Sequence, residues 1–155
     1  MNNSIILERK TFLEALKTGG ASASANATMP ILENVRITSD GENGVKITSN
    51  NLQTEVVCFC KAEQMPVDEF DFCVNAKDIT NVCSALKDYN VRLVIEENAL
   101  NVCYAAGSMK IPTVNSDEFP CLKTDSEPVA VFEIENQSLK NILESEKQRF
   151  YQRTP

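Results

Sequence analysis

Apolar and polar positions follow one spacing at three places along the chain. At each place, an apolar residue that ends an alternating run is followed by apolar residues five, eight and nine positions later. The three sets begin at Leu7, Val74 and Ile134. Alternation is typical of a half-buried strand, and apolar positions three and four apart mark one face of a helix. The pattern therefore predicts three copies of a short strand that leads directly into an amphipathic helix.

Strand-like runs follow each of the first two copies. They are rich in β-branched and aromatic residues, and dipeptides such as Asp-Gly and Asn-Asn separate them. The expected strands are 31–38, 44–49, 52–60, 91–96, 100–104 and 109–114. Each unit then has the order strand–helix–strand–strand–strand. Two such units are expected to join their sheets and to place both helices on one face, where the apolar stripes are buried.

The third copy has a strand and a helix, the helix expected at about 137–153, but no return strands follow. A lone strand and helix cannot bury an apolar stripe by themselves. Either the chain is a piece of a longer protein, or this tail packs against another surface of the same domain or of a neighbouring chain. We expect one complete domain over 1–124 and the truncated start of a second over 125–155.

The residue types exclude several kinds of chemistry. The chain contains no histidine, which removes the common catalytic triads and acid–base catalysis by imidazole. It also has no glycine-rich loop of the kind that cradles nucleotide phosphates. The six cysteines fall mostly inside apolar runs, and their spacing is a poor zinc signature, so buried free thiols are expected. We therefore expect no enzyme, no cofactor and no metal.

The overall composition is that of an ordinary globular protein, with 43% hydrophobic and 24% charged residues. No apolar run is long enough to cross a bilayer. The N-terminus lacks the basic start and the apolar stretch of a signal peptide. We expect a cytoplasmic protein with no membrane partner.

Charge is distributed unevenly along the chain, whose net charge is −7. The helical segments 9–19, 75–90 and 136–153 together carry +4, whereas the remaining residues carry −11. If the helices share one face, the molecule can hold a polyanion there while its acidic face repels stray DNA. The alternative is that solvated helices simply favour lysine and arginine.

Four segments carry a resemblance to a known family. They are Thr28-Met29-Pro30-Ile31-Leu32, Thr48-Ser49-Asn50-Asn51-Leu52-Gln53, Val74-Asn75-Ala76-Lys77-Asp78-Ile79 and the stretch 109–120 that ends in Asp117-Glu118-Phe119-Pro120. In this order they resemble motifs of the bacterial DNA polymerase III beta subunit, the replicative sliding clamp. The resemblance implies an α+β sliding-clamp domain. It also implies that a family chain has three such domains and that two chains close a ring around duplex DNA. Strands form the outer wall, helices line the hole, and the contacts are to phosphates without sequence specificity.

The resemblance also assigns roles to individual residues. The positions that it implies for DNA contact are Arg9, Lys10, Lys17, Asn26, Lys77, Lys147 and Arg149. Asn26 stands where the family often offers an arginine, which weakens the contact expected from that loop. The positions that resemble the apolar patch facing a partner chain are Leu86, Met109 and Ile111. The alternative for these three residues is plain core packing, because alternating strand residues must put some side chains inside.

The expected function is that of a DNA sliding clamp-like processivity factor, as a fragment or shortened homologue, that associates with duplex DNA. The alternative is a non-enzymatic interaction or regulatory module with a clamp-like fold and no DNA binding. DNA polymerase III and the clamp loader are the partners implied for the full-length family. Their peptide pocket lies between domains that this chain does not supply, so we expect no processive synthesis from it alone. Self-association through the sheet edge at 109–114 is a further expectation.

Overall fold

The structure is a computed structural model that describes residues 4–41, 44–122 and 127–152, with side chains described as far as Arg149. It divides into two compact units, Met1–Lys123 and Thr124–Pro155, which we treat separately. In chain order the elements are β1 (Ser4–Glu8), α1 (Arg9–Gly19), the 3-10 turn η1 (Pro30–Glu33), β2 (Asn34–Ser39), β3 (Gly44–Asn50), β4 (Glu55–Lys61), β5 (Asp71–Asn75), α2 (Ala76–Ala85), β6 (Asn90–Ile95), β7 (Ala99–Tyr104), β8 (Gly107–Val114), the 3-10 turn η2 (Ser116–Glu118) and α3 (Asn136–Gln152). No helix in the described ranges combines the length and apolarity needed to span a membrane.

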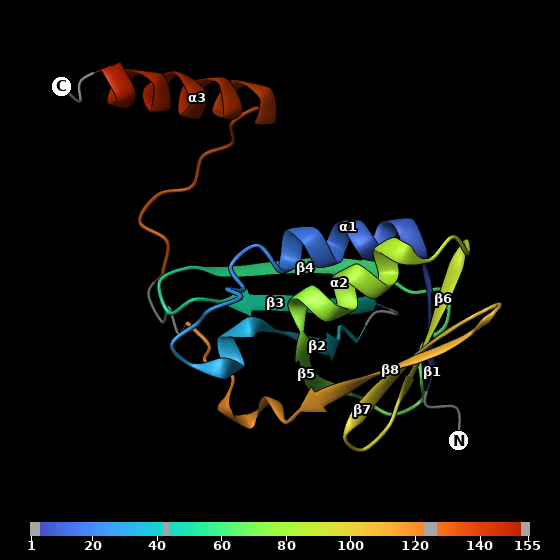
Figure 1. The fold of residues 1–155 in the computed structure, drawn as a ribbon. Helices are drawn as coiled ribbons and strands as arrows, with labels where there is room; N and C mark the ends of the chain where they lie inside the picture. Colours follow the sequence, from blue (N-terminus) through green and yellow to red (C-terminus); the bar gives the residue numbers. More distant parts are fainter. Residues whose placement is uncertain (1–3, 42–43, 123–126, 153–155) are drawn as a thin grey trace. The chain divides into compact units, whose positions relative to one another are not determined.

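The first unit is one eight-stranded antiparallel sheet with two helices on one face (Figure 1). The strand order is β1-β6-β7-β8-β5-β2-β3-β4. The chain just beyond β4 returns to β1, where the Ile6 N–H donates to the Gln64 carbonyl at 3.0 Å. The α+β fold and the common face of α1 and α2 confirm the prediction from sequence.

The duplication is visible in the pairing of the strands. The first unit of the repeat, β1–α1–β2–β3–β4, recurs as β5–α2–β6–β7–β8. The two copies exchange their first strands, because β1 pairs with β6 of the second copy and β5 pairs with β2 of the first. Equivalent positions also make equivalent closing contacts: Ile6 bridges to Gln64, and Cys73 bridges to Val114. The first two copies of the predicted repeat are therefore confirmed.

The apolar stripes of both helices are buried as their spacing predicts. In α1 the buried side chains include Phe12, Ala15 and Leu16, and in α2 they include Ile79, Val82 and Cys83. All six belong to one core cluster with residues from both halves of the sheet. The core thus lies between the sheet and the helices, so their opposite sides are left to solvent.

The predicted strand of the third copy is wrong. Its helix is present as α3, but residues 127–135 form no strand, and Ile134 is exposed. A strand needs hydrogen-bonded neighbours, and the described residues of the second unit contain no strand that could pair with this stretch. The alternation of apolar residues therefore predicted a strand that does not form, because the described residues of the second unit offer it no partner strand.

Two strands begin later than predicted, and the other predicted boundaries differ by at most two residues. Residues 31–33 belong to the 3-10 turn η1, because Pro30 fixes the backbone at its start, and β2 begins only at Asn34. Residues 52–54 belong to a tight turn before β4. There the Asn51 side chain accepts hydrogen bonds from the N–H groups of Gln53 and Thr54, which holds Leu52 near a φ of 72°. These hydrogen bonds from the backbone to the Asn51 side chain stabilise a turn, so β4 begins only at Glu55.

Half of the cysteines match the expectation of buried thiols. Burial raises the pKa of Cys60 to about 11 and those of Cys73 and Cys83 to about 12. Cys58 and Cys103 are half-buried, and Cys121 is exposed. The three buried thiols are protonated at neutral pH and pack as small apolar side chains.

Adding one methyl group at Gly19 is expected to destabilise the domain. This residue ends α1 against β3, and a Cβ atom there would lie 2.7 Å from the Ile47 Cγ2 atom and 3.2 Å from the Cys58 Cβ atom. Gly19→Ala is expected to lower the free energy of unfolding by about 2 kcal/mol, since overpacking outweighs the helix propensity of alanine. Urea denaturation measures the change. Gly107→Ala is the control, because its Cβ would meet only ordinary contacts; equal effects at both sites would contradict the packing described.

An ion pair on the outer face of the sheet should make stability depend on pH. Arg36 donates to Asp71 through Nε at 2.9 Å and through Nη2 at 2.6 Å. The hydrogen bonds from Arg36 lower the pKa of Asp71 below its ordinary value. Because the folded-state pKa is depressed, the stabilisation is present above about pH 4 and is lost as the pH falls through the folded-state value.

We therefore expect Asp71→Asn to lower the free energy of unfolding at pH 7 by about 1 kcal/mol. The expected loss of unfolding free energy is small because the Asp71 side chain is 40% exposed and solvent screens the ion pair. The difference from the parent chain should shrink below about pH 4 in urea titrations. Asp68→Asn, in an exposed loop, is the control. A difference that stays constant down to pH 3 would contradict the assignment to this ion pair.

Candidate nucleic-acid interface

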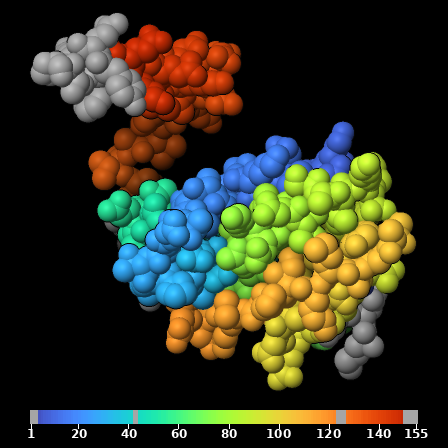
Figure 2. Space-filling model, in the orientation of Figure 1, coloured from blue at the N-terminus to red at the C-terminus, as the bar shows by residue number. Residues whose placement is uncertain are grey.

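The helix face of the first unit is formed by α1 and α2, which pack beside each other over the sheet. Figure 2 shows their adjoining surfaces, α1 in blue and α2 in yellow-green. The exposed lysines of these helices are Lys10, Lys17 and Lys77. Lys10 and Lys17 are seven residues apart and so share one stripe of α1. Three of the residues implied for DNA contact therefore lie on the same face.

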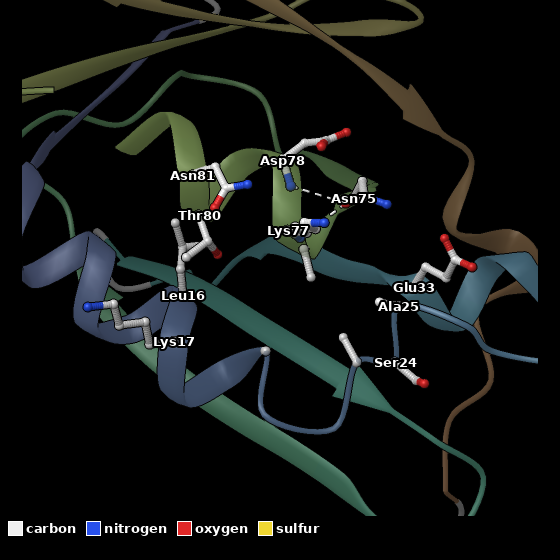
Figure 3. A pocket seen from close by; sticks show the side chains of 13 residues that line it. Leu16, Lys17, Ser24, Ala25, Glu33, Asn75, Lys77, Asp78, Thr80 and Asn81 are labelled. Carbon is white, nitrogen blue, oxygen red and sulfur yellow. Dashed lines mark hydrogen bonds between the residues drawn. The ribbon is translucent and has the colours of Figure 1, made fainter. Parts of the chain in front are cut away.

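A cavity of about 460 Å³ lies where α1 ends and α2 begins. Its walls come from the last turns of α1, from the chain that follows it between Gly20 and Glu33, and from the first turns of α2 (Figure 3). Leu16 and Ala76 contribute apolar surface, and Lys17 and Lys77 contribute the positive charges. The cavity thus brings together residues 60 positions apart in the sequence through the pairing of the two repeat copies.

The start of α2 is capped by its own chain. The Asn75 Oδ1 atom accepts hydrogen bonds from the N–H groups of Lys77 at 3.0 Å and Asp78 at 3.1 Å, as drawn in Figure 3. Asparagine directly after a strand is a preferred N-cap residue, so the sequence explains this geometry. These two N–H groups are therefore occupied, and the positive charge offered to a ligand comes mainly from the lysine side chains.

Two acidic residues line the same cavity and were not among the predicted site residues. They are Asp78 on α2 and Glu33 at the end of η1. Together with Lys17 and Lys77 they bring the formal charge of the lining to zero. Asp78 follows Lys77 directly in one of the motifs of the sequence, but only the fold brings Glu33 to this place. The lining of the cavity therefore has no net positive charge with which to hold an anion.

Arg9 does not lie free on the helix face. Its Nε atom donates to the Asp88 carbonyl at 2.9 Å, and its Nη1 atom donates to the Cys83 carbonyl at 3.4 Å. The guanidinium thus ties the start of α1 to the end of α2, where carbonyl groups lack helical partners. These hydrogen bonds give Arg9 a structural role, and its contact with DNA stays a prediction. Nothing in the local sequence signals a bond to residues so distant in the chain.

The loop that holds Asn26 is exposed and carries no charged residue between Lys17 and Glu33. Asn26 lines a shallow hollow with the neighbouring small residues and with Leu52 from the turn before β4. The loop can offer hydroxyl, amide and backbone groups to a ligand but no positive charge.

In the second unit, Lys147 and Arg149 are both exposed on α3. Arg149 forms an ion pair with Glu146, with 3.1 Å between Nη1 and Oε1. The exposed pair leaves both side chains in solvent and contributes little to stability.

The three residues expected at a subunit interface lie in different environments. Met109 on β8 is 45% exposed, and Leu86, which follows α2, is half-buried against the core. Ile111 is only 5% exposed and belongs to the core cluster. The core-packing alternative therefore describes Ile111, because its side chain points to the buried side of β8.

The duplicated strand–helix–three-strand unit, with both helices on one face of the sheet, has the architecture that the resemblance to sliding clamps implies. Residues 3–123 match the family model described as DNA polymerase III beta subunit, N-terminal domain. The chain therefore belongs to the family of the DNA polymerase III beta subunit.

Solved beta subunits share the fold at low sequence identity. The structure from Thermotoga maritima has a TM-score of 0.81 and 21% identity over 91% of this chain, and the one from Pseudomonas aeruginosa has 0.81 and 20% over 91%. The structure from Streptococcus pneumoniae has 0.80 and 22% over 90%. This chain spans 38% of the length of each of the three. No curated protein matches it.

Proposed function

We propose that this chain is a sliding-clamp module that lays its helix face along duplex DNA and contacts phosphates without sequence specificity. One observation carries the proposal: α1 and α2 share a face that exposes Lys10, Lys17 and Lys77. Membership in the beta subunit family supports it. The proposed role is that of a processivity scaffold in DNA replication, without a catalytic step of its own. This role implies a cytoplasmic location.

The affinity should be weak and sensitive to salt. The two helices also carry Glu14 and Asp78, and Arg9 is engaged in bonds within the protein. About three lysines therefore remain for phosphates. Each phosphate contact contributes a slope of about −0.9 in a plot of log K against log salt. A slope near −3 is expected for the first unit, and Lys147 and Arg149 on α3 can add to it.

Binding of a fluorescent duplex, followed by anisotropy at increasing salt, tests the proposal. We expect binding at low salt, a linear loss of log K with log salt, and equal affinity for two duplexes of unrelated sequence. No binding at the lowest salt would overturn the proposal. It would favour the alternative of an interaction or regulatory module without DNA binding.

The proposal also includes the protein partners of a complete clamp. A solved Helicobacter pylori beta clamp is bound to a DNA ligase peptide, and 33% of that clamp's length is covered by this chain. We propose DNA polymerase III and the clamp loader as partners of the full-length assembly, and we also propose self-association. The chain by itself is expected to support no processive synthesis. Long primer-extension products from a single binding event, with polymerase and loader from the same source, would contradict this.

A further inference from the structure

The segment 115–122, which follows β8, lies on the outer face of the sheet, opposite the helices. It contains η2, which packs against β5. The Ser116 side chain forms a hydrogen bond with the Asp71 carboxylate. At the other end of the segment, the Leu122 N–H donates to the Glu55 Oε2 atom at 3.0 Å. Side chains of the sheet thus hold this segment at both ends.

Cys73 in β5 faces the same side of the sheet as this segment. Its neighbours Phe72 and Val74 belong to the core cluster beneath the helices, and successive side chains of a strand point in opposite directions. Cys73 therefore points away from the helices, yet it has no exposed surface. Because η2 packs against β5, the segment 115–122 helps to cover this thiol.

The Arg36 side chain connects Cys73 with a second thiol. Arg36 in β2 and Cys73 in β5 are cross-strand partners. At the far end of the same side chain, the Arg36 Nη1 atom donates to the Cys121 Sγ atom at 3.3 Å. Cys121 belongs to the segment 115–122 and is exposed, so small solutes can reach it. A buried thiol and an exposed thiol, far apart in the sequence, therefore lie beside one arginine.

The two thiols differ in their access to reagents. Burial raises the pKa of Cys73 to about 12, and the neighbouring Asp71 and Cys121 add to this rise while Arg36 opposes it. The Cys73 thiol is consequently protonated at neutral pH and shielded from solvent, which makes it inert by itself. An oxidant in solution therefore meets Cys121 first.

We propose that Cys121 is a site of oxidation by hydroperoxides and that Cys73 converts the product into a disulfide within the chain. With hydrogen peroxide, the Cys121 sulfur bonds to one oxygen, the O–O bond breaks, and the thiol proton leaves with the other oxygen as water. The Cys73 sulfur then displaces the hydroxyl group of the Cys121 sulfenic acid. That group takes the Cys73 proton and leaves as a second water. Two thiols are thus oxidised by two electrons, and one peroxide is reduced.

The disulfide would join the segment 115–122 covalently to β5. It restricts the unfolded chain, so we expect the midpoint of urea unfolding to shift to a higher urea concentration. The second step should be slow, on a scale of minutes to hours, because the Cys73 thiol is buried and protonated. Neither step depends on DNA binding.

Peroxide treatment of the full chain, followed by non-reducing peptide mapping with mass spectrometry, tests the proposal. We expect a Cys73–Cys121 linked peptide pair within one chain, and dithiothreitol should release it and reverse the shift in the urea midpoint. Cys121→Ser should abolish the link. Cys73→Ala should also abolish it and leave a Cys121 sulfenic acid that dimedone traps. Cys103→Ser, which removes a half-buried thiol of β7, is the matched control and should leave the link intact.

The parent chain alone can contradict the proposal, so the test does not depend on the folding of the variants. Cys121 that stays reduced, or that proceeds to a sulfinic acid while Cys73 remains a free thiol, would overturn it. So would a disulfide from Cys121 to any other cysteine, or one that joins two chains.

Discussion

Phe12→Ala is expected to lower the free energy of unfolding by about 4 kcal/mol. Phe12 begins the buried stripe of α1 and has no exposed surface. Its removal loses the burial of an aromatic ring and leaves a cavity between the helix and the sheet. A domain of this size is usually stable by only about 5–15 kcal/mol, so the variant should be near the limit of folding at ambient temperature. Urea denaturation followed by circular dichroism measures the effect.

Lys10→Ala is the control for that variant, because Lys10 lies in the same helix and is exposed. It is expected to change stability by at most about 0.5 kcal/mol. If Phe12→Ala cost less than about 1 kcal/mol, α1 would not be packed through the stripe that the repeat predicts.

The second large effect is expected on DNA binding. Lys17→Glu combined with Lys77→Glu reverses two of the three exposed lysines on the helix face. The double variant should reduce the magnitude of the salt slope by about 2 and weaken binding at low salt at least tenfold. Fluorescence anisotropy with the same duplex measures both quantities.

A matched control separates the helix face from net charge. Lys46→Glu combined with Lys61→Glu makes the same change in net charge on the opposite face of the sheet, and it should weaken binding far less. Asp78→Asn, which removes an acidic residue beside Lys77, should strengthen binding. Equal losses of DNA affinity from the two double variants would mean that DNA does not bind preferentially to the helix face.

The repeat was the part of the fold that sequence could predict, because burial imposes a period on side chains. Leu16 in α1 and Val82 in α2 each belong to the apolar face that the spacing predicts, and both lie in the core. The same kind of pattern failed at Ile134, since alternation reports which side chains are apolar and not whether a neighbouring strand exists. Pairing is a long-range property that no local window contains.

The candidate site was less predictable than the fold for a related reason. Counting charge indicated the helices, and the resemblance indicated the individual lysines. The engagement of Arg9 by the end of α2 depends on a contact between the two repeat copies. Glu33 comes to the cavity only because η1 follows α1 back toward α2. Ile111 shows the same limit, because alternation along β8 does not tell which side of the strand is covered.

A lysine footprint tests most directly whether DNA lies on the helix face. Brief acetylation of the protein, with and without duplex DNA at low salt, can be read at each lysine by mass spectrometry. We predict that DNA protects Lys10, Lys17 and Lys77 and leaves Lys46 and Lys61 as reactive as in the free protein. Protection of Lys46 and Lys61, with the helix lysines unchanged, would contradict the account.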